Sequence, residues 1–106
     1  MPSRIERYRA ERHPFVAGIQ ITDIDTETQL AAHTEDLNLF GCFVETDRPF
    51  ADWTKIRLRI SHNGTIFTAE GRVTYTRGRA GMGIVFTSIE PTSLAVLDAW
   101  LTELRK

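Results

Sequence analysis

The sequence has a single cysteine, Cys42, and four prolines in 106 residues. One cysteine cannot form an intramolecular disulfide, and the apolar run 40–44 around it predicts a small buried side chain, not a reactive thiol. No apolar run approaches the ~18 residues that a membrane-spanning helix needs, and the charged N-terminus lacks the apolar segment of a signal peptide. We therefore expect a cytoplasmic protein without a membrane span.

The chain also lacks an excess of charge of either sign. Thirteen Lys and Arg residues face fourteen Asp and Glu residues, so the formal net charge is −1. A nearly neutral chain has no general attraction for nucleic acid or for an anionic membrane, and any site for an anion must be local. With 42% hydrophobic and 25% charged residues, the composition is that of one globular domain with a modest core.

Signatures of catalysis are missing as well. The three histidines show no metal-ligand spacing with one another or with Cys42, and no Gly-rich phosphate loop is present. Asp23 and Asp25 form a carboxylate pair, but aspartates at this spacing are typical of a turn, in which the side chain bonds to its own backbone. We expect no catalytic residues, no metal site and no cofactor.

Most of the chain shows the period-two alternation of β-strands. Strands are expected at residues 15–22, 28–34, 42–46, 55–60, 67–76 and 82–86. The pair Asn63-Gly64 predicts a tight hairpin because both positions tolerate positive φ. The alternation turns Tyr75 and Phe86 toward the interior of the fold and leaves His62, beside the hairpin, as a solvated polar residue.

The spacing of the apolar residues changes from that of a strand to that of a helix after residue 90, where Pro91 suits the first position of a helix. A helix is expected from Pro91 to Leu104. Its predicted apolar stripe consists of Leu94, Leu97, Leu101 and Leu104, flanked by Val96 and Trp100. Short antiparallel strands followed by one amphipathic helix predict a mainly-β fold, a small barrel with a C-terminal helix.

Two local patterns could bind a ligand. Residues 1–14 form a basic and largely extended arm that contains Arg7, Arg9 and Arg12, and arginine pairs with phosphate and stacks on flat rings. The second pattern, residues 36–41, alternates Asp36 and Asn38 with leucines before Gly41. Taken separately, each pattern has a plain explanation: a solvated basic tail for the first, and a strand end with a turn for the second.

Taken together, the two patterns resemble the PilZ domain. That family carries a basic arm with an Arg-x-x-x-Arg motif and, about twenty-five residues later, an Asp/Asn-x-Ser-x-x-Gly motif. The second motif here reads Asp36-x-Asn38-x-x-Gly41. The similarity continues through segments 42–46, 56–60, 69–73 and 81–86 and through the C-terminal helix, so it covers nearly the whole chain.

The resemblance implies a single domain over residues 15–106, a six-stranded antiparallel β-barrel plus the C-terminal helix, preceded by a flexible arm over residues 1–14. It also implies binding of cyclic di-GMP between the arm and the outer face of the barrel, with a conformational signal to an unknown protein partner. A nucleic-acid partner is not expected, because no exposed aromatic strand motif accompanies the basic residues. The residues that the family pattern assigns to the ligand are Arg7, Arg9, Arg12, Asp36, Asn38 and Gly41.

Two positions depart from the family pattern. Counting back from Arg12, the first arginine of Arg-x-x-x-Arg falls on Tyr8, which Arg7 and Arg9 flank. Asn38 stands where the family has serine. Some PilZ domains with altered motifs do not bind the nucleotide and act as protein-interaction modules. The alternative function is therefore an adaptor that works without a ligand.

Overall fold

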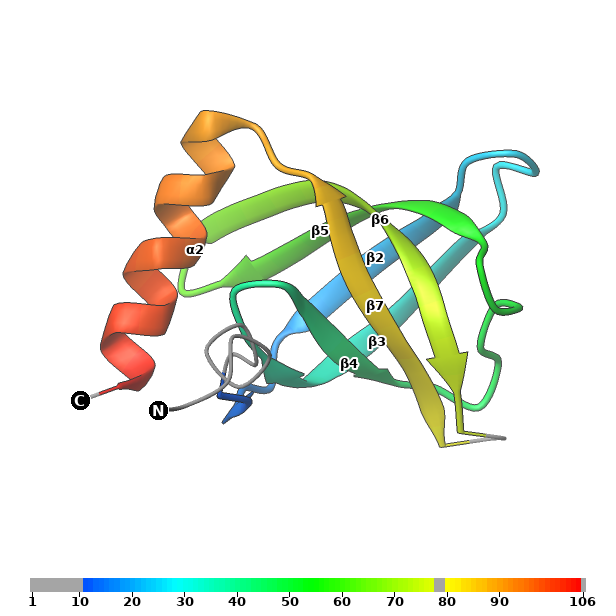
Figure 1. Ribbon diagram of the computed structural model, residues 1–106, viewed down its shortest axis with the longest axis horizontal. Helices are drawn as coiled ribbons and strands as arrows, with labels where there is room; N and C mark the ends of the chain where they lie inside the picture. The colour runs from blue at the N-terminus through cyan, green and yellow to red at the C-terminus, as the bar shows by residue number, and fades with distance from the viewer. Residues whose placement is uncertain (1–10, 78–79, 106) are drawn as a thin grey trace, which may run out of the picture.

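Seven strands and one helix follow one another in the computed structural model, which describes residues 11–77 and 80–105 (Figure 1). The elements are β1 (His13–Pro14), β2 (Gly18–Asp23), β3 (Gln29–Leu37), β4 (Gly41–Glu45), β5 (Lys55–His62), β6 (Thr65–Thr76), β7 (Gly81–Ser88) and α2 (Pro91–Leu104).

Six of the strands close into a barrel in which every pairing is antiparallel. The order β3-β2-β5-β6-β7-β4 is closed by the pairing of β4 with β3. The two-residue β1 pairs with the end of β3 that β2 leaves unpaired, since β2 reaches only His33 whereas β1 pairs with Asp36 and Leu37. The expected six-stranded antiparallel barrel is confirmed.

Strand β3 extends further than the sequence pattern indicated. We expected a strand over 28–34, but β3 continues to Leu37. Its pairing with β4 shifts register between Thr34 and Asp36, which is a β-bulge. The bulge interrupts the period-two alternation, so the prediction ended too early. As a consequence, Asp36 lies in a strand and not in the turn that follows.

The hairpin between β5 and β6 forms as predicted, because Asn63 and Gly64 both have positive φ, at 51° and 76°. The prediction for the neighbouring His62 is wrong. Its ring is half-buried and lies 4.7 Å from the ring of Phe15 and 5.5 Å from that of Trp100. The rings of Phe15 and Trp100 pack against this histidine, and only part of its ring is exposed to solvent.

The barrel interior is filled by the inward positions of the strands, as the alternation predicted. Each of the six barrel strands supplies fully buried side chains, among them Ile21, Leu37, Val44, Ile60, Phe67 and Met82. Phe86 is only partly buried, although its ring packs 5.1 Å from that of Phe67. It lies near the end of β7, where the strand leaves the barrel for the helix.

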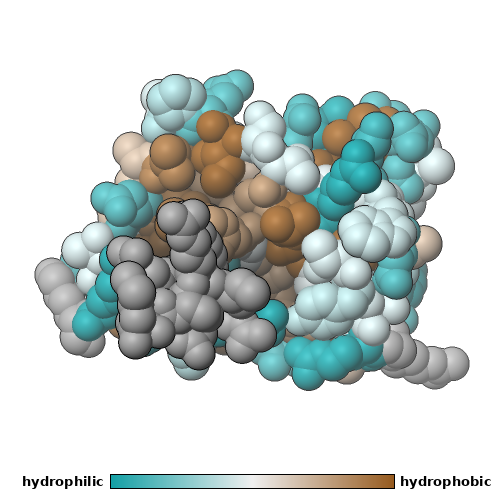
Figure 2. Space-filling model, in the orientation of Figure 1, coloured by the Kyte–Doolittle hydropathy of each residue, from teal (hydrophilic) through white to brown (hydrophobic). Residues whose placement is uncertain are grey.

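Helix α2 has the predicted bounds and covers one end of the barrel (Figure 1). Leu97, Trp100 and Leu101 are buried, but Leu94 is 44% exposed, so its place on the predicted stripe is wrong. The first turn faces β6 through Ser93, whose hydroxyl bonds to Thr68, and this contact rotates Leu94 away from the barrel. Figure 2 shows apolar surface gathered between α2 and β7 on the face in view.

Cys42 is buried in β4, as its neighbours predicted. Burial, and secondarily the charge of Asp36, raises the pKa of its thiol to about 12. The thiol is therefore protonated and unreactive at physiological pH. Within the described ranges, no helix combines the length and the apolar character that crossing a bilayer requires.

Candidate functional site

A hollow of about 170 Å³ lies on the outer surface of the barrel, where β3, β4, β6 and β7 meet the end of the N-terminal arm. Its walls combine charged, amide, hydroxyl and aromatic groups with exposed strand backbone. The lining residues are Arg12, Asp36, Asn38, Phe40, Gly41, Cys42, Thr74, Tyr75, Gly83, Ile84 and Val85. Four of the six residues that the family pattern assigns to a ligand meet in this hollow.

Arg12 lies at the rim, between a carboxylate and a phenol. Its Nη1 donates to the hydroxyl of Tyr75 at 3.4 Å and lies 3.8 Å from Oδ2 of Asp36. The hydrogen bond to Tyr75, with a smaller contribution from the charge of Asp36, raises the pKa of the guanidinium. The Arg12 side chain is 56% exposed and donates a hydrogen bond only to Tyr75 among the described residues, so further N–H donors are available to an anion.

The β-bulge in β3 orients Asp36. Its Oδ1 accepts a hydrogen bond from the backbone N–H of Phe43 on β4 at 3.1 Å, which bridges the two strands beside the register shift. The other oxygen, Oδ2, faces Arg12. One carboxylate oxygen therefore fixes the local backbone, while the second is presented to the hollow.

Asn38 shapes the turn between β3 and β4 with its side-chain oxygen. Oδ1 accepts from the backbone N–H of Phe40 at 2.8 Å and of Gly41 at 2.9 Å, an Asx-type turn. Because both hydrogen bonds come from backbone N–H groups, the side-chain atom that accepts them must be Oδ1 and not Nδ2. The Nδ2 group has no protein partner among the residues that the structure describes, so Asn38 can offer a ligand donors but no acceptor.

Gly41 is needed for close packing of strands. Its φ is not in the left-handed region, but a Cβ at this position would collide with the carbonyl oxygen of Ile84 on β7. The backbone of β4 can therefore lie against β7 at the edge of the hollow only if residue 41 has no side chain.

Tyr75 is the site residue that the sequence reasoning missed. The alternation placed it inside the barrel, but β6 and β7 shift register between Val73 and Tyr75, and the half-buried ring instead lines the hollow. It stacks on Phe43, with centroids 6.0 Å apart, and lies over Gly83. Gly83 within β7 was the available signal, because a glycine inside a strand often marks a close approach.

The Phe43 ring is covered on a second side by a cation. The guanidinium carbon of Arg77 lies 4.0 Å from the ring centroid, a cation–π contact. Arg77, Phe43 and Tyr75 thus form a layered support next to Asp36. This support fixes the Tyr75 ring, to whose hydroxyl Arg12 donates.

The remaining predicted ligand residues, Arg7 and Arg9, lie outside the described residues, as does Tyr8. The structure brings together Arg12, Asp36, Asn38 and Gly41.

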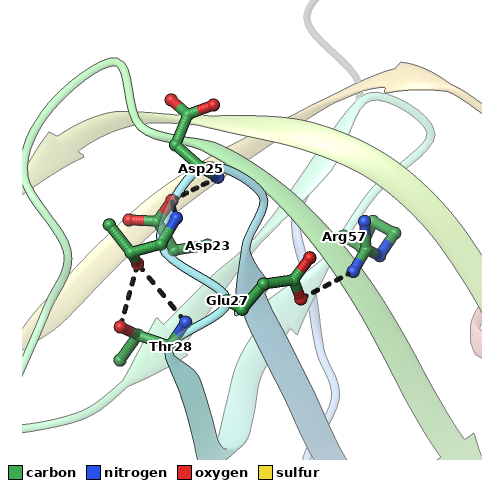
Figure 3. A network of polar contacts seen from close by, with 6 residues as sticks. Asp23, Asp25, Glu27, Thr28 and Arg57 are labelled. Atoms are coloured by element: carbon green, nitrogen blue, oxygen red, sulfur yellow. Dashed lines mark hydrogen bonds and ion pairs between the residues drawn. The ribbon is translucent and has the colours of Figure 1, made fainter.

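The carboxylate pair of the β2–β3 connection has the structural role expected from the sequence. Asp23 Oδ1 accepts from the backbone N–H groups of Asp25 and Thr26, and Glu27 pairs with Arg57 at 3.2 Å (Figure 3). In the described part of the chain, no group of three or more His, Cys, Asp or Glu residues is arranged to hold a metal ion.

Comparison of the sequence with protein families matches the PilZ domain over residues 6–103. No curated protein matches the chain significantly.

Solved structures share the fold at low sequence identity. The PilZ domain of CeSA from a cellulose-synthesizing bacterium is 17% identical with a TM-score of 0.72, over 91% of this chain and 99% of that one. The PilZ domain of YcgR from Escherichia coli, solved with c-di-GMP, is 16% identical with a TM-score of 0.72, over 93% and 92%. The Bacillus subtilis inhibitor of motility MotI/DgrA is 17% identical with a TM-score of 0.71, over all of this chain and 57% of that protein.

Proposed function

The chain belongs to the PilZ domain family, and we propose that it is a cytoplasmic receptor for cyclic di-GMP, which binds in the hollow between Arg12 and Asp36. The observation that carries the proposal is the convergence of Arg12, Asp36, Asn38 and Gly41 on one hollow, although the arm and the turn are distant in sequence. The structural likeness to a PilZ domain solved with c-di-GMP supports the same ligand.

The groups in the hollow match the chemistry of a guanine nucleotide. Asp36 Oδ2 can accept the N–H edge of guanine, whereas Asn38 Nδ2 can donate to O6 or N7. Arg12 can pair with a phosphate through two parallel N–H groups or stack on a base. Each type of group that the ligand needs is present once, and each is held in place by its own backbone or ring contact.

Binding requires Arg12 to exchange partners. Its pair with Asp36 is long, at 3.8 Å, and the arginine is largely exposed. A pair of this kind contributes roughly 0–1 kcal/mol, so replacing it costs little. The guanine edge would then occupy Asp36 Oδ2, and the released guanidinium would turn to a phosphate.

The described hollow provides part of the site. Pockets for drug-sized ligands measure about 300–1,000 Å³, whereas this hollow is about 170 Å³. We propose that Arg7 and Arg9 complete the site and bind the second phosphate, so that the arm closes over the ligand. Closure of the arm would convert binding into a signal for a protein partner. The proposed activity is binding without catalysis.

Isothermal titration calorimetry with cyclic di-GMP at near-physiological salt tests this function. We expect saturable binding, with cyclic di-AMP, GTP and GMP bound more weakly by about tenfold or more. Loss of the guanine edge leaves Asp36 poorly paired, which costs on the order of 1–3 kcal/mol. Equal affinity for cyclic di-AMP would mean that the arm binds phosphate nonspecifically and that the site does not recognise guanine. Absence of binding at high micromolar ligand would reject the receptor in favour of the adaptor.

A further inference from the structure

Phe15 fills the junction between the N-terminal arm and helix α2. It follows Arg12 by three residues in the sequence and is 5% exposed. Its ring lies 4.7 Å from that of His62 at the end of β5 and 5.4 Å from that of Trp100 on α2. The His62 and Trp100 rings also meet edge to face at 5.5 Å, so the three rings form one closed cluster.

The backbone of Phe15 is clamped to β3 on both sides. Its N–H donates to the carbonyl of Glu35 at 3.1 Å, and its carbonyl accepts from the buried hydroxyl of Thr34 at 2.6 Å. Thr34 also accepts from the N–H of Ala17 at 3.0 Å. The Phe15 backbone therefore moves together with this part of β3.

The same part of β3 carries the ligand site. His13 pairs with Leu37 and Pro14 with Asp36, directly before Phe15. Asp36 in turn faces Arg12. The short segment 12–15 thus contacts the site through Arg12 and belongs, through Phe15, to the cluster of three rings at α2.

We propose that Phe15 is a positioning residue that couples the state of the Arg12–Asp36 site to the packing of α2 on the barrel. A change at Arg12 shifts the end of the arm, this shift moves the Phe15 ring, and the ring changes the packing of Trp100 against the barrel. The packing of helix α2 then reports the state of the site. The role of the nucleotide rests on the proposed function, whereas the coupling itself is a property of the contacts just described.

Coupling between two sites is reciprocal. If ligand binding changes the packing of Trp100, then a change at Trp100 must alter ligand affinity by the same factor. Phe15 lies between the two, so its replacement should uncouple them. A double-mutant cycle measures this coupling.

The coupling can be measured without any ligand. The sequence has two tryptophans, and the exposed Trp53 can be replaced in a Trp53→Phe background so that Trp100 alone reports by its fluorescence. In that background, we expect Arg12→Ala to shift the Trp100 emission to longer wavelength and to speed amide exchange of α2 by up to roughly fivefold. Arg48→Ala, an exposed arginine paired with Asp47 at 3.9 Å, is the matched control and should leave both signals unchanged.

Phe15→Leu keeps an apolar side chain at the junction but removes the ring contacts. We expect the response of Trp100 to Arg12→Ala to disappear in the Phe15→Leu background, while circular dichroism shows an intact fold. If Arg12→Ala leaves Trp100 and α2 unchanged, or if the response persists with Phe15→Leu, the coupling is overturned.

A second experiment uses cyclic di-GMP itself. If it binds, Trp100 emission should shift on titration, and the shift should be lost in Phe15→Leu. Binding by calorimetry with no change at Trp100 would overturn the coupling and leave the receptor function intact. No binding would reject the proposed function, and the ligand-free cycle would still decide whether Phe15 couples the arm to α2.

Discussion

The ring of Tyr75 lies directly on the backbone of Gly83, so that a Cβ on Gly83 would stand 2.6 Å from Cζ of the ring. An approach this close is tolerated only when the strand residue is glycine. Since Tyr75 accepts a hydrogen bond from Arg12, the absence of a side chain at Gly83 determines where Arg12 lies.

Gly83→Ala should therefore damage the site and the barrel together. The new methyl group must displace a stacked ring, and overpacking of this kind costs about 1–3 kcal/mol of stability. Loss of the Arg12 anchor should weaken cyclic di-GMP binding by roughly tenfold, the equivalent of one charge-assisted hydrogen bond. Urea denaturation and calorimetry measure the two effects.

Gly18→Ala is the matched control, because a Cβ at Gly18 would have no neighbour within 4 Å. We expect this variant to fold and bind as the parent does. Normal stability and affinity in Gly83→Ala would show that Tyr75 can move without consequence for the site.

Arg12→Ala should separate binding from folding. The guanidinium is largely exposed and its ion pair is long, so the midpoint of thermal unfolding should hardly change. Affinity for cyclic di-GMP should fall by roughly tenfold to a hundredfold, because a charged hydrogen bond contributes about 1.5–3 kcal/mol. Arg48→Ala controls for the lost charge. An unfolded Arg12→Ala protein would mean that the arm is structural and the site assignment wrong.

Tyr8→Arg restores the Arg-x-x-x-Arg spacing of the family relative to Arg12. One additional charge-assisted contact to phosphate should raise affinity by roughly tenfold to a hundredfold, as measured by calorimetry. Tyr8→Phe is the control, since it changes the residue without adding charge. A variant that binds no better than a tightly binding parent would indicate that Arg7 or Arg9 already provides this contact.

Cys42 should make stability depend on pH in the alkaline range. Its pKa in the folded protein is raised from 9.0 to about 12, so the unfolded chain loses the proton first. The thiol's contribution to stability is complete below pH 9 and is lost as the pH rises toward 12. The slope in this window reaches up to about 1.4 kcal/mol per pH unit.

Comparison with Cys42→Ala isolates that contribution, because the other groups titrate alike in both proteins. We expect the difference in unfolding free energy between parent and variant to change across this window and to stay constant below it. A thiol reagent should also react slowly with the native parent at pH 8. A difference that does not vary with pH would contradict the raised pKa.

Local sequence signals predicted most of the fold. Asn63-Gly64 requires a specific turn chemistry, and Pro91 followed by apolar residues at helical spacing gives the bounds of α2. Such signals act within a few residues and can be read from one sequence. Leu94 fails because Ser93 reaches Thr68 on a distant strand, which a helical pattern does not contain.

The site was less accessible to sequence reasoning because bulges decide it. The register shift at Tyr75 turns an apparently internal ring to the outer face, and the shift before Asp36 carries this carboxylate into a strand. A bulge adds one residue to a strand, so the side chains that follow it point to the opposite face of the sheet. The amino-acid composition gives no obvious sign of this change. The family motif nevertheless indicated Asp36, Asn38 and Gly41 as neighbours of Arg12.

The short strand β4 has a kinetic consequence. It joins β3 to β7, and its partners lie far from one another in the chain, whereas the β5–β6 hairpin forms from adjacent residues. Because loop closure delays non-local pairing, we expect β4 to pair with β7 late in folding, on a timescale of roughly milliseconds to seconds. Gly41 meets Ile84 of β7 only at that step, so a newly made chain cannot respond to a ligand until the last strand pairing of the barrel has formed.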